Sequence, residues 1–495
     1  MIFRLSRFVR SLLVALAYSA IGASAVLLIA GIVYLNQQAD LEVWHLADLD
    51  AEFTEASGVT TFAAYLAREE RLFQQLNEKV YARIAADERR QINRYHRNSL
   101  SDPARRSPNW NRSFVRRAAS PKAGVLLLHG MSDSPYSLRA IGEKLNAAGA
   151  TVLGLRLPGH GTAPSGLVEV RWQDMAAAVR LAMRQLADEV GASGEGAAPP
   201  LYIVGYSTGA ALAVNYALAT LDDGALAKVD KLVLLSPAIG VSSAAVLAVW
   251  QARLGHLLGL EKLAWNVILP EYDPYKYGSF AVNAGDLVYR LTTQIQSRLD
   301  ALSGSGKLEG FPPLLAFSSV VDATVSAPAL VSGLFERLPA GGHELVLFDI
   351  TRLAEIEPLL KFDPAAAVRA LRDNPERAFA LSLVSNENAN SRRVVELTLA
   401  SGEQRPREAA LDLSWPDGVY SLAHVALPFP PDDPVYGGQA VRQGGVIQLG
   451  DVALRGERGV LQIPASDILR LRWNPFFPYR SEEHTSELQS PCNLV

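Results

Sequence analysis

The sequence contains one short motif that is typical of a nucleophilic serine. Residues 205–209 read GYSTG and follow the apolar run Leu201–Val204. A serine at a sharp strand-to-helix turn, with a glycine two positions away on either side, is the nucleophile elbow, and we expect Gly205 and Gly209 to make that turn possible. The alternative is an ordinary turn whose serine caps a helix. The strand before and the helix after the motif favour Ser207 as a catalytic nucleophile.

A second apolar run, Val125–Leu128, ends in His-Gly. In a hydrolase with such an elbow, an N–H of this loop and the N–H after the nucleophile bind the oxyanion. The donors would be the backbone groups of Met131 and Thr208. The His129 and His160 side chains are interpreted as packed, hydrogen-bonded structural groups.

Together these segments resemble a known superfamily. The run HGMSDSPYSLRAIGEKLNAAGATVLGLRLPGHGT, followed by GYSTG, is similar to the α/β-hydrolases, in particular to their carboxylesterase, monoacylglycerol-lipase and lysophospholipase-like branch. The similarity covers roughly residues 120–240. It implies ester hydrolysis through a Ser-Asp-His triad, a small-molecule or lipid ester as substrate, and no metal or organic cofactor.

The expected acid is Asp322. It lies in SSVVDATV after the apolar run Leu314–Phe317, where the superfamily places its acid, and the chain order serine, acid, histidine is kept. The alternative is an aspartate that only caps a helix beginning near Thr324.

Four histidines follow Ser207, and His424 is the expected base. His256 precedes Asp322, His343 begins a strand instead of following it, and His484 lies in a doubtful tail. The separation from Asp322 to His424 is longer than the superfamily usually shows. It is explained only if the chain before His424 returns to the sheet edge. A buried structural histidine is the alternative, and His343 is then the next candidate base.

The elements that would position these residues alternate along the chain. Short apolar runs separated by helical segments predict a mostly parallel sheet with helices on both faces, which is an α/β-hydrolase fold. The expected strands are Val125–Leu128, Thr151–Leu155, Leu201–Val204, Leu232–Leu235, Leu314–Phe317 and Glu344–Phe348, and the helices include Leu138–Ala148, Trp172–Val190 and Ala210–Leu221. We expect a hydrolase domain over residues 119–479, with a helical, aromatic-rich cap at about 238–310 and an insertion at about 350–420. The cap region could equally be a helical elaboration of the core.

The N-terminus predicts a membrane anchor. Arg4, Arg7 and Arg10 precede an uncharged run of 25 residues, Ser11–Leu35, which exceeds the ~20 residues that a spanning helix needs. The positive-inside rule then places residues 1–40 as a cytoplasmic tip and a single-pass transmembrane anchor in a bacterial inner membrane, with the catalytic domain in the periplasm. A cleaved signal peptide is the alternative, but its apolar core is usually only ~7–15 residues long.

Residues 41–118 are expected to form a helical stalk or brace, whose apolar positions recur every three or four residues, followed by a polar linker from about Arg97. Residues 480–495 (RSEEHTSELQSPCNLV) resemble a translated sequencing adapter, so we expect them, including Cys492, to be an artefact.

The net charge of −4 argues against a nucleic-acid partner. An acyltransferase or thioesterase with the same triad, or a catalytically silent binding domain on the same fold, are the competing functions.

Overall fold

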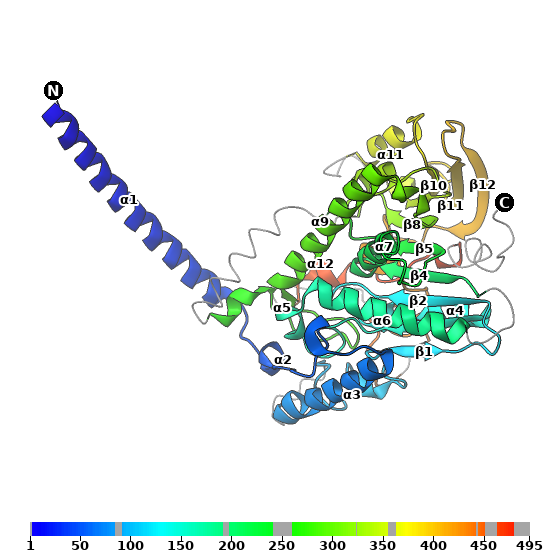
Figure 1. The fold of residues 1–495 in the computed structure, drawn as a ribbon, viewed down its shortest axis with the longest axis horizontal. Coiled ribbons are helices and arrows are strands. Elements are labelled where there is room, and N and C mark those ends of the chain that lie inside the picture. Colours follow the sequence, from blue (N-terminus) through cyan, green and yellow to red (C-terminus); the bar gives the residue numbers. More distant parts are fainter. Residues whose placement is uncertain are drawn as a thin grey trace.

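The protein is built around one large β-sheet. The computed structural model describes residues 2–84, 92–191, 198–240, 260–322, 324–354, 363–441, 444–450 and 463–479. Its main sheet has ten strands in the order β1-β3-β2-β4-β5-β8-β9-β10-β11-β12 (Figure 1). The strands are β1 (Phe114–Arg116), β2 (Ala123–Leu128), β3 (Ala150–Leu155), β4 (Leu201–Tyr206), β5 (Lys231–Leu235), β8 (Leu314–Ser319), β9 (Glu344–Phe348), β10 (Ala380–Asn386), β11 (Arg393–Leu399) and β12 (Arg407–Ser414).

The central strands form the expected parallel sheet. All neighbours from β3 to β10 pair in parallel, whereas β1, β11 and β12 pair antiparallel with their neighbours. Strands β2, β3, β4 and β8 are buried along their whole length, which explains why their sequences are continuously apolar instead of alternating. All six predicted strands are confirmed.

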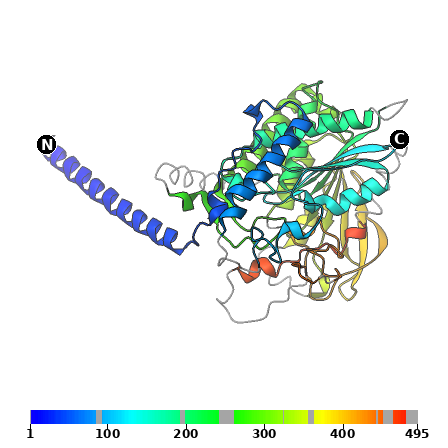
Figure 2. The ribbon, with the colours of Figure 1, turned by 90° about the horizontal axis from the view of Figure 1, so that it is seen from below.

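Helices cover both faces of this sheet. One face carries α3, α6, α7 and α9, while α4 and the chain after β12 cover the other; Figure 2 shows the blue α3 and the green helices on one side and the orange and red C-terminal segments on the other. The helices are α1 (Ile2–Gln37), α2 (Val43–Leu46), α3 (Phe62–Lys79), α4 (Arg139–Ala147), α5 (Gly166–Glu169), α6 (Trp172–Gly191), α7 (Thr208–Thr220), α9 (Val282–Ser305), α10 (Ala327–Gly333), α11 (Pro364–Arg372) and α12 (Ala465–Ile468).

The segment before the sheet is a brace and not a free stalk. The apolar face of α3 is buried, and the Tyr65 hydroxyl donates to the backbone carbonyl of Arg156 (2.5 Å). The expectation of a linker up to residue 118 is wrong, because β1 lies inside it and pairs with β3. Trp110 and Asn111 are buried as well, so this polar stretch is part of the folded domain.

The expected cap is largely a helical elaboration of the core. Residues 241–259 lie outside the described residues. Helix α9 packs against α7 with a buried apolar side. The small hairpin of β6 (Trp265–Val267) and β7 (Phe280–Ala281) precedes α9, and the loop between these two strands approaches the candidate site described below.

The expected insertion at about 350–420 extends the sheet. It contains α11 and the strands β10, β11 and β12, of which β10 continues the parallel order beside β9. Both ends of the segment lie at one place, because the Thr351 N–H donates to the Tyr420 carbonyl (2.8 Å). The chain therefore re-enters the domain at the point where it left.

Helix α1 projects from the domain (Figure 1). Its segment Val9–Gln37 is 29 residues long and contains an 18-residue stretch with a mean hydropathy of 2.3, in which no residue is buried in the rest of the protein. By length and composition, this helix can cross a membrane or serve as a signal sequence.

Candidate active site

Ser207 occupies the turn between β4 and α7. Its backbone has φ 53° and ψ −116°, a left-handed conformation that non-glycine residues rarely adopt and that stores strain. A Cβ at Gly209 would lie 2.1 Å from the Leu128 carbonyl oxygen, and one at Gly205 would lie 2.5 Å from the Ala210 Cα. The two glycines are therefore required by close backbone approach, and the turn holds the serine at the carboxyl end of the sheet.

Asp322 and His424 are in direct contact, although 102 positions separate them. His424 Nδ1 lies 2.9 Å from Asp322 Oδ2, and Asp322 Oδ1 accepts the N–H groups of Thr324 (2.8 Å) and Val325 (2.9 Å). Burial raises the pKa of Asp322, but the hydrogen bond and charge of His424, with the two N–H donors, bring it below its ordinary value. Asp322 does not cap α10, because Ser326 does so.

His424 lies beside the serine turn. Its ring centroid is 5.4 Å from that of Tyr206, the residue before Ser207, and the Tyr206 hydroxyl donates to the His424 carbonyl (3.4 Å). The assignment of His424 required the chain before it to return to the sheet edge. The hydrogen bond between Thr351 and Tyr420 shows that it does return there. His343 instead precedes β9 and contacts Phe311 (ring centroids 6.1 Å apart) before β8, at the opposite end of the sheet.

The loop after β2 faces the serine turn. A Cβ at Gly209 would meet the Leu128 and His129 carbonyl oxygens, which brings the end of β2 against the start of α7. Among the described residues, neither the Met131 N–H nor the Thr208 N–H donates to a backbone carbonyl in a turn or loop. Thr208 opens α7, where the first N–H groups have no partner inside the helix. The His129 ring accepts the Leu157 N–H at Nε2 (3.0 Å) and faces the Gly130 carbonyl with Nδ1 (2.9 Å). Burial lowers the pKa of His129 well below its usual value. The ring is therefore neutral, and its hydrogen bonds join the loop after β2 to Leu157.

A second segment holds this loop in place. Lys276 Nζ donates to Asp133 Oδ1 (2.9 Å) and to the Met131 carbonyl (3.4 Å), and the Tyr277 N–H donates to the Ser132 carbonyl (2.8 Å). Ser132 itself has a positive φ of 63°. Burial raises the pKa of Asp133 despite the lysine beside it. The β6–β7 loop thus fixes a strained loop that carries a candidate oxyanion donor.

A small cavity of about 170 Å³ opens beside these groups. Tyr206 and Val425, which adjoin Ser207 and His424 in the chain, line it together with Asp133, Lys276 and Arg472. Arg472 is held by the Tyr272 hydroxyl (2.8 Å). Ser207, Asp322 and His424 do not line this cavity themselves, and its walls carry side chains of both charges.

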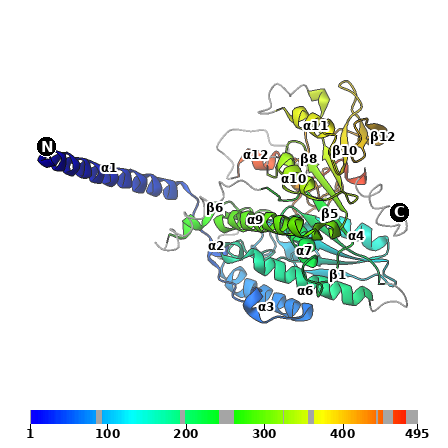
Figure 3. The same cartoon turned by 45° about the horizontal axis from the view of Figure 1, so that its top comes forward.

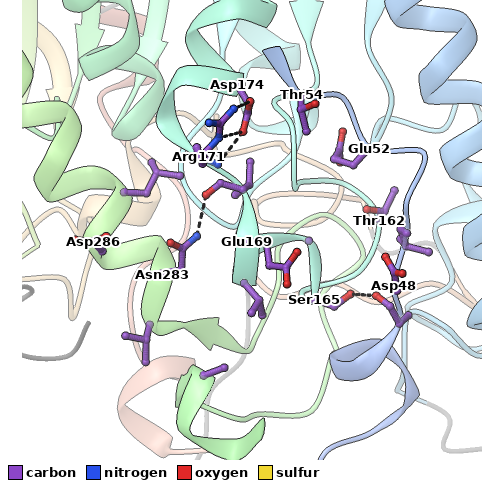
Figure 4. Close-up of a pocket in the computed structure, with 18 of the residues that line it drawn as sticks. Asp48, Glu52, Thr54, Thr162, Ser165, Glu169, Arg171, Asp174, Asn283 and Asp286 are labelled. Atoms are coloured by element: carbon purple, nitrogen blue, oxygen red, sulfur yellow. Dashed lines mark hydrogen bonds and ion pairs between the residues drawn. The ribbon is translucent and has the colours of Figure 1, made fainter. Parts of the chain in front are cut away.

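A larger groove lies elsewhere. A groove of about 1630 Å³ runs between the brace, the loop around α5 and α9 (Figure 4). Figure 4 shows Arg171 bonded to Asp174, and Asn283 reaching from α9 to the α5 loop. None of Ser207, Asp322 and His424 lines this groove, so its size alone does not make it the reaction site.

Sequence reasoning missed Lys276, Asp133 and Arg472. Asp133 follows the His-Gly pair closely, so its place near the oxyanion loop was readable. Lys276 lies 143 residues away in a loop with no local signal, and only the fold brings the two together.

The chain has the α/β-hydrolase fold. Residues 119–349, slightly less than half of the chain, match the family model described as serine aminopeptidase, S33. This match agrees with the α/β-hydrolase resemblance that the sequence predicted.

Solved structures with similarity to this chain include lipolytic enzymes. A metagenome-derived lipase structure (LipS and LipT) shares 18% identity over 54% of this chain and 98% of its own, with a TM-score of 0.35. The monoacylglycerol lipase of Paleococcus ferrophilus shares 19% identity over 48% of this chain and 88% of its own, with a TM-score of 0.34. The monoglyceride lipase of Saccharomyces cerevisiae shares 14% identity over 48% of this chain and 82% of its own, with a TM-score of 0.35. No curated protein matches the chain.

Proposed function

We propose that this chain is a membrane-anchored serine hydrolase that cleaves carboxylic esters. The observation that carries the proposal is the contact of 2.9 Å between His424 Nδ1 and Asp322 Oδ2 at the sheet edge that also bears the strained Ser207 turn. Sequence order, turn geometry and this hydrogen bond agree on one set of three groups.

The chemistry follows from the tautomer of His424. With Nδ1–H donated to Asp322, Nε2 has a free lone pair and removes the Ser207 proton as Ser207 Oγ attacks the ester carbonyl. Asp322 stays ionised and stabilises the imidazolium. The N–H groups of Met131 and Thr208 bind the oxyanion, each donor lowering the barrier by ~3–4 kcal/mol. His424 then protonates the leaving alcohol, and water releases the acid from the acyl-enzyme by the reverse relay.

The anchor is α1. Arg4, Arg7 and Arg10 in the first turns of α1, with Asp40 and Glu42 after its end, support a cytoplasmic N-terminus and a hydrolase domain on the outer face of a bacterial inner membrane. Protease added to intact spheroplasts should then degrade the hydrolase domain. Protection of the domain until the cells are lysed contradicts this orientation.

The first test is labelling of the full chain in detergent with a fluorophosphonate probe, which reacts with activated serines. Wild-type protein should be labelled, and Ser207→Ala and His424→Ala should lose the label. His343→Ala is the matched control, because it removes another buried histidine far from the serine, and it should retain labelling. A folded wild-type protein that is not labelled refutes the proposal, and labelling lost only in Ser207→Ala refutes His424 as the base.

A substrate panel then separates reaction types. Acyl esters of p-nitrophenol, a thioester and an aminoacyl p-nitroanilide are compared, with and without an added alcohol acceptor. Release of free acid from the oxygen esters supports the proposal. Preferential transfer to the alcohol, or preferential cleavage of the anilide, assigns acyl transfer or aminopeptidase activity instead.

A further inference from the structure

Exposed apolar side chains gather where α1 joins the domain. Outside α1, the described part of the chain has seven large hydrophobic side chains that are strongly exposed. Three of them are Leu46 (50% exposed), Leu260 (39%) and Val267 (43%), from α2, the segment before β6, and β6. We call these three residues the anchor-side patch.

Residues next to the patch side chains bring α2 and β6 together. The His45 ring contacts the Trp265 ring edge-on, with centroids 4.9 Å apart, which places α2 against β6. Leu46 and Leu260 line the same groove. His45 and Trp265 are both buried, so the two elements that carry Leu46 and Val267 are packed into the folded domain.

The patch is also fixed close to the end of α1. Lys262 Nζ forms an ion pair with Asp40 (2.8 Å) and donates to the Gln38 carbonyl (3.3 Å). Asp40 is three residues beyond the last helical residue, Gln37, and three residues reach at most about 11 Å. Figure 3 accordingly places β6 beside the end of α1. Whatever surface α1 emerges from, the patch lies next to it.

We propose that the anchor-side patch rests on the lipid bilayer that α1 spans. This inference rests on the proposed membrane anchor. Apolar side chains gathered beside a spanning helix leave water when they enter the interface between head groups and acyl chains, and the short tether supplies the proximity. Docking at this patch fixes the orientation of the domain on the membrane, and it turns the groove that Leu46 and Leu260 line toward the lipid.

The test measures the depth of single fluorophores in the full chain. Cys492 is replaced by serine, one cysteine is introduced and labelled with NBD, and the protein is placed in nanodiscs of phosphatidylcholine with or without doxyl-labelled lipid, which quenches NBD at close range. Patch positions are Leu46→Cys, Leu260→Cys and Val267→Cys. The controls are Ile21→Cys within α1 and Tyr420→Cys, which is equally exposed (51%) and lies where the chain after β12 returns to the end of β9.

We expect quenching at Ile21 and at all three patch positions, at least twofold stronger than at Tyr420. If Ile21 is quenched but quenching at the three patch positions equals that at Tyr420, whether low or high, the docking proposal is overturned and the proposed anchor stands. Absence of quenching at Ile21 refutes the anchor itself. The five labelled positions carry exposed side chains, so their replacement by cysteine should leave the fold intact.

Discussion

The brace is joined to the hydrolase domain by a buried charge cluster, and replacing Glu69 by alanine tests how much that union contributes. Arg156 is 1% exposed and Glu69 is 4% exposed. Glu69 accepts from Arg156 Nε (3.1 Å), from the Ser113 hydroxyl (2.8 Å) and from the Ser113 N–H (3.1 Å). The Glu52 carboxylate accepts hydrogen bonds from Arg156 Nη1 (2.9 Å) and Nη2 (2.8 Å).

The magnitude follows from this burial. Removing one partner of a buried ion pair usually costs 3–5 kcal/mol, because the remaining charge stays desolvated. Glu52 still pairs with Arg156, which limits the loss, whereas the two Ser113 bonds add about 1 kcal/mol each. We therefore expect Glu69→Ala to destabilise the protein by about 4 kcal/mol, which corresponds to a fall in Tm of roughly 4 °C for a folded unit of this size.

Thermal unfolding of the full chain in detergent, followed by circular dichroism, measures this shift. Lys79→Ala is the matched control on the same helix, because its partner Asp50 is exposed and such pairs contribute little. The double variant Glu69→Ala/Arg156→Met should lose less than the sum of the two single variants, since it leaves no unpaired guanidinium. If Glu69→Ala melts within a degree or two of Lys79→Ala, the brace is not integral to the domain.

Three further predictions concern the site and the pH response. Lys276→Met should lower kcat on an ester substrate by about 10- to 100-fold with little change in KM, because the loop carrying the Met131 donor loses its contacts with the Lys276 ammonium. Lys276→Arg should restore part of the lost kcat. An unchanged kcat in Lys276→Met contradicts the positioning role. Gly209→Ala should abolish fluorophosphonate labelling or leave the protein insoluble, since the new methyl group overlaps a carbonyl, and normal labelling refutes the strained-turn argument. Burial lowers the pKa of three histidines to about 4, namely His45, His160 and His343. Between pH 6.5 and 4 the unfolded chain binds these protons and the folded chain does not, so the free energy of unfolding decreases as the pH is lowered, by about 1 kcal/mol per pH unit for each histidine. The urea midpoint should be lower at pH 5 than at pH 7. Because the buried His129 contributes in the same way, His343→Gln should reduce this difference by about a quarter, and an unchanged difference contradicts a neutral His343 in the folded protein.

The local elements were predictable because their signals are local. The six parallel strands are apolar runs that needed no knowledge of their partners, and the GYSTG turn carries its own strand and helix on either side. Burial on both faces produces a continuous pattern that is hard to confuse with a surface strand. The position of Asp322 followed from the apolar strand before it, from the chain order of the triad and from the family resemblance.

The contacts that join distant segments were not predictable in the same way. Nothing near Arg156 shows that Glu52 and Glu69 approach it, and the stretch before residue 118 looked like a linker because its buried groups are polar. Strands β10 and β11 did carry a readable signal, in the form of ALSLVSN and RVVELTL separated by a turn-rich segment. Their role as a continuation of the sheet required the pairing with β9.

The long separation between Asp322 and His424 has a physical explanation in the closure of that extension. An inserted segment disturbs a fold little when its ends meet, since the cost of closing a loop grows only slowly with its length. The hydrogen bond from Thr351 to Tyr420 closes the segment at the edge where β9 ends, and the extension pairs its own strands beyond it. Leu422, 1% exposed, then packs into the core two positions before His424. The sheet can therefore gain three strands between Asp322 and His424, the proposed acid and base. The two side chains remain within hydrogen-bonding distance, with 2.9 Å between His424 Nδ1 and Asp322 Oδ2.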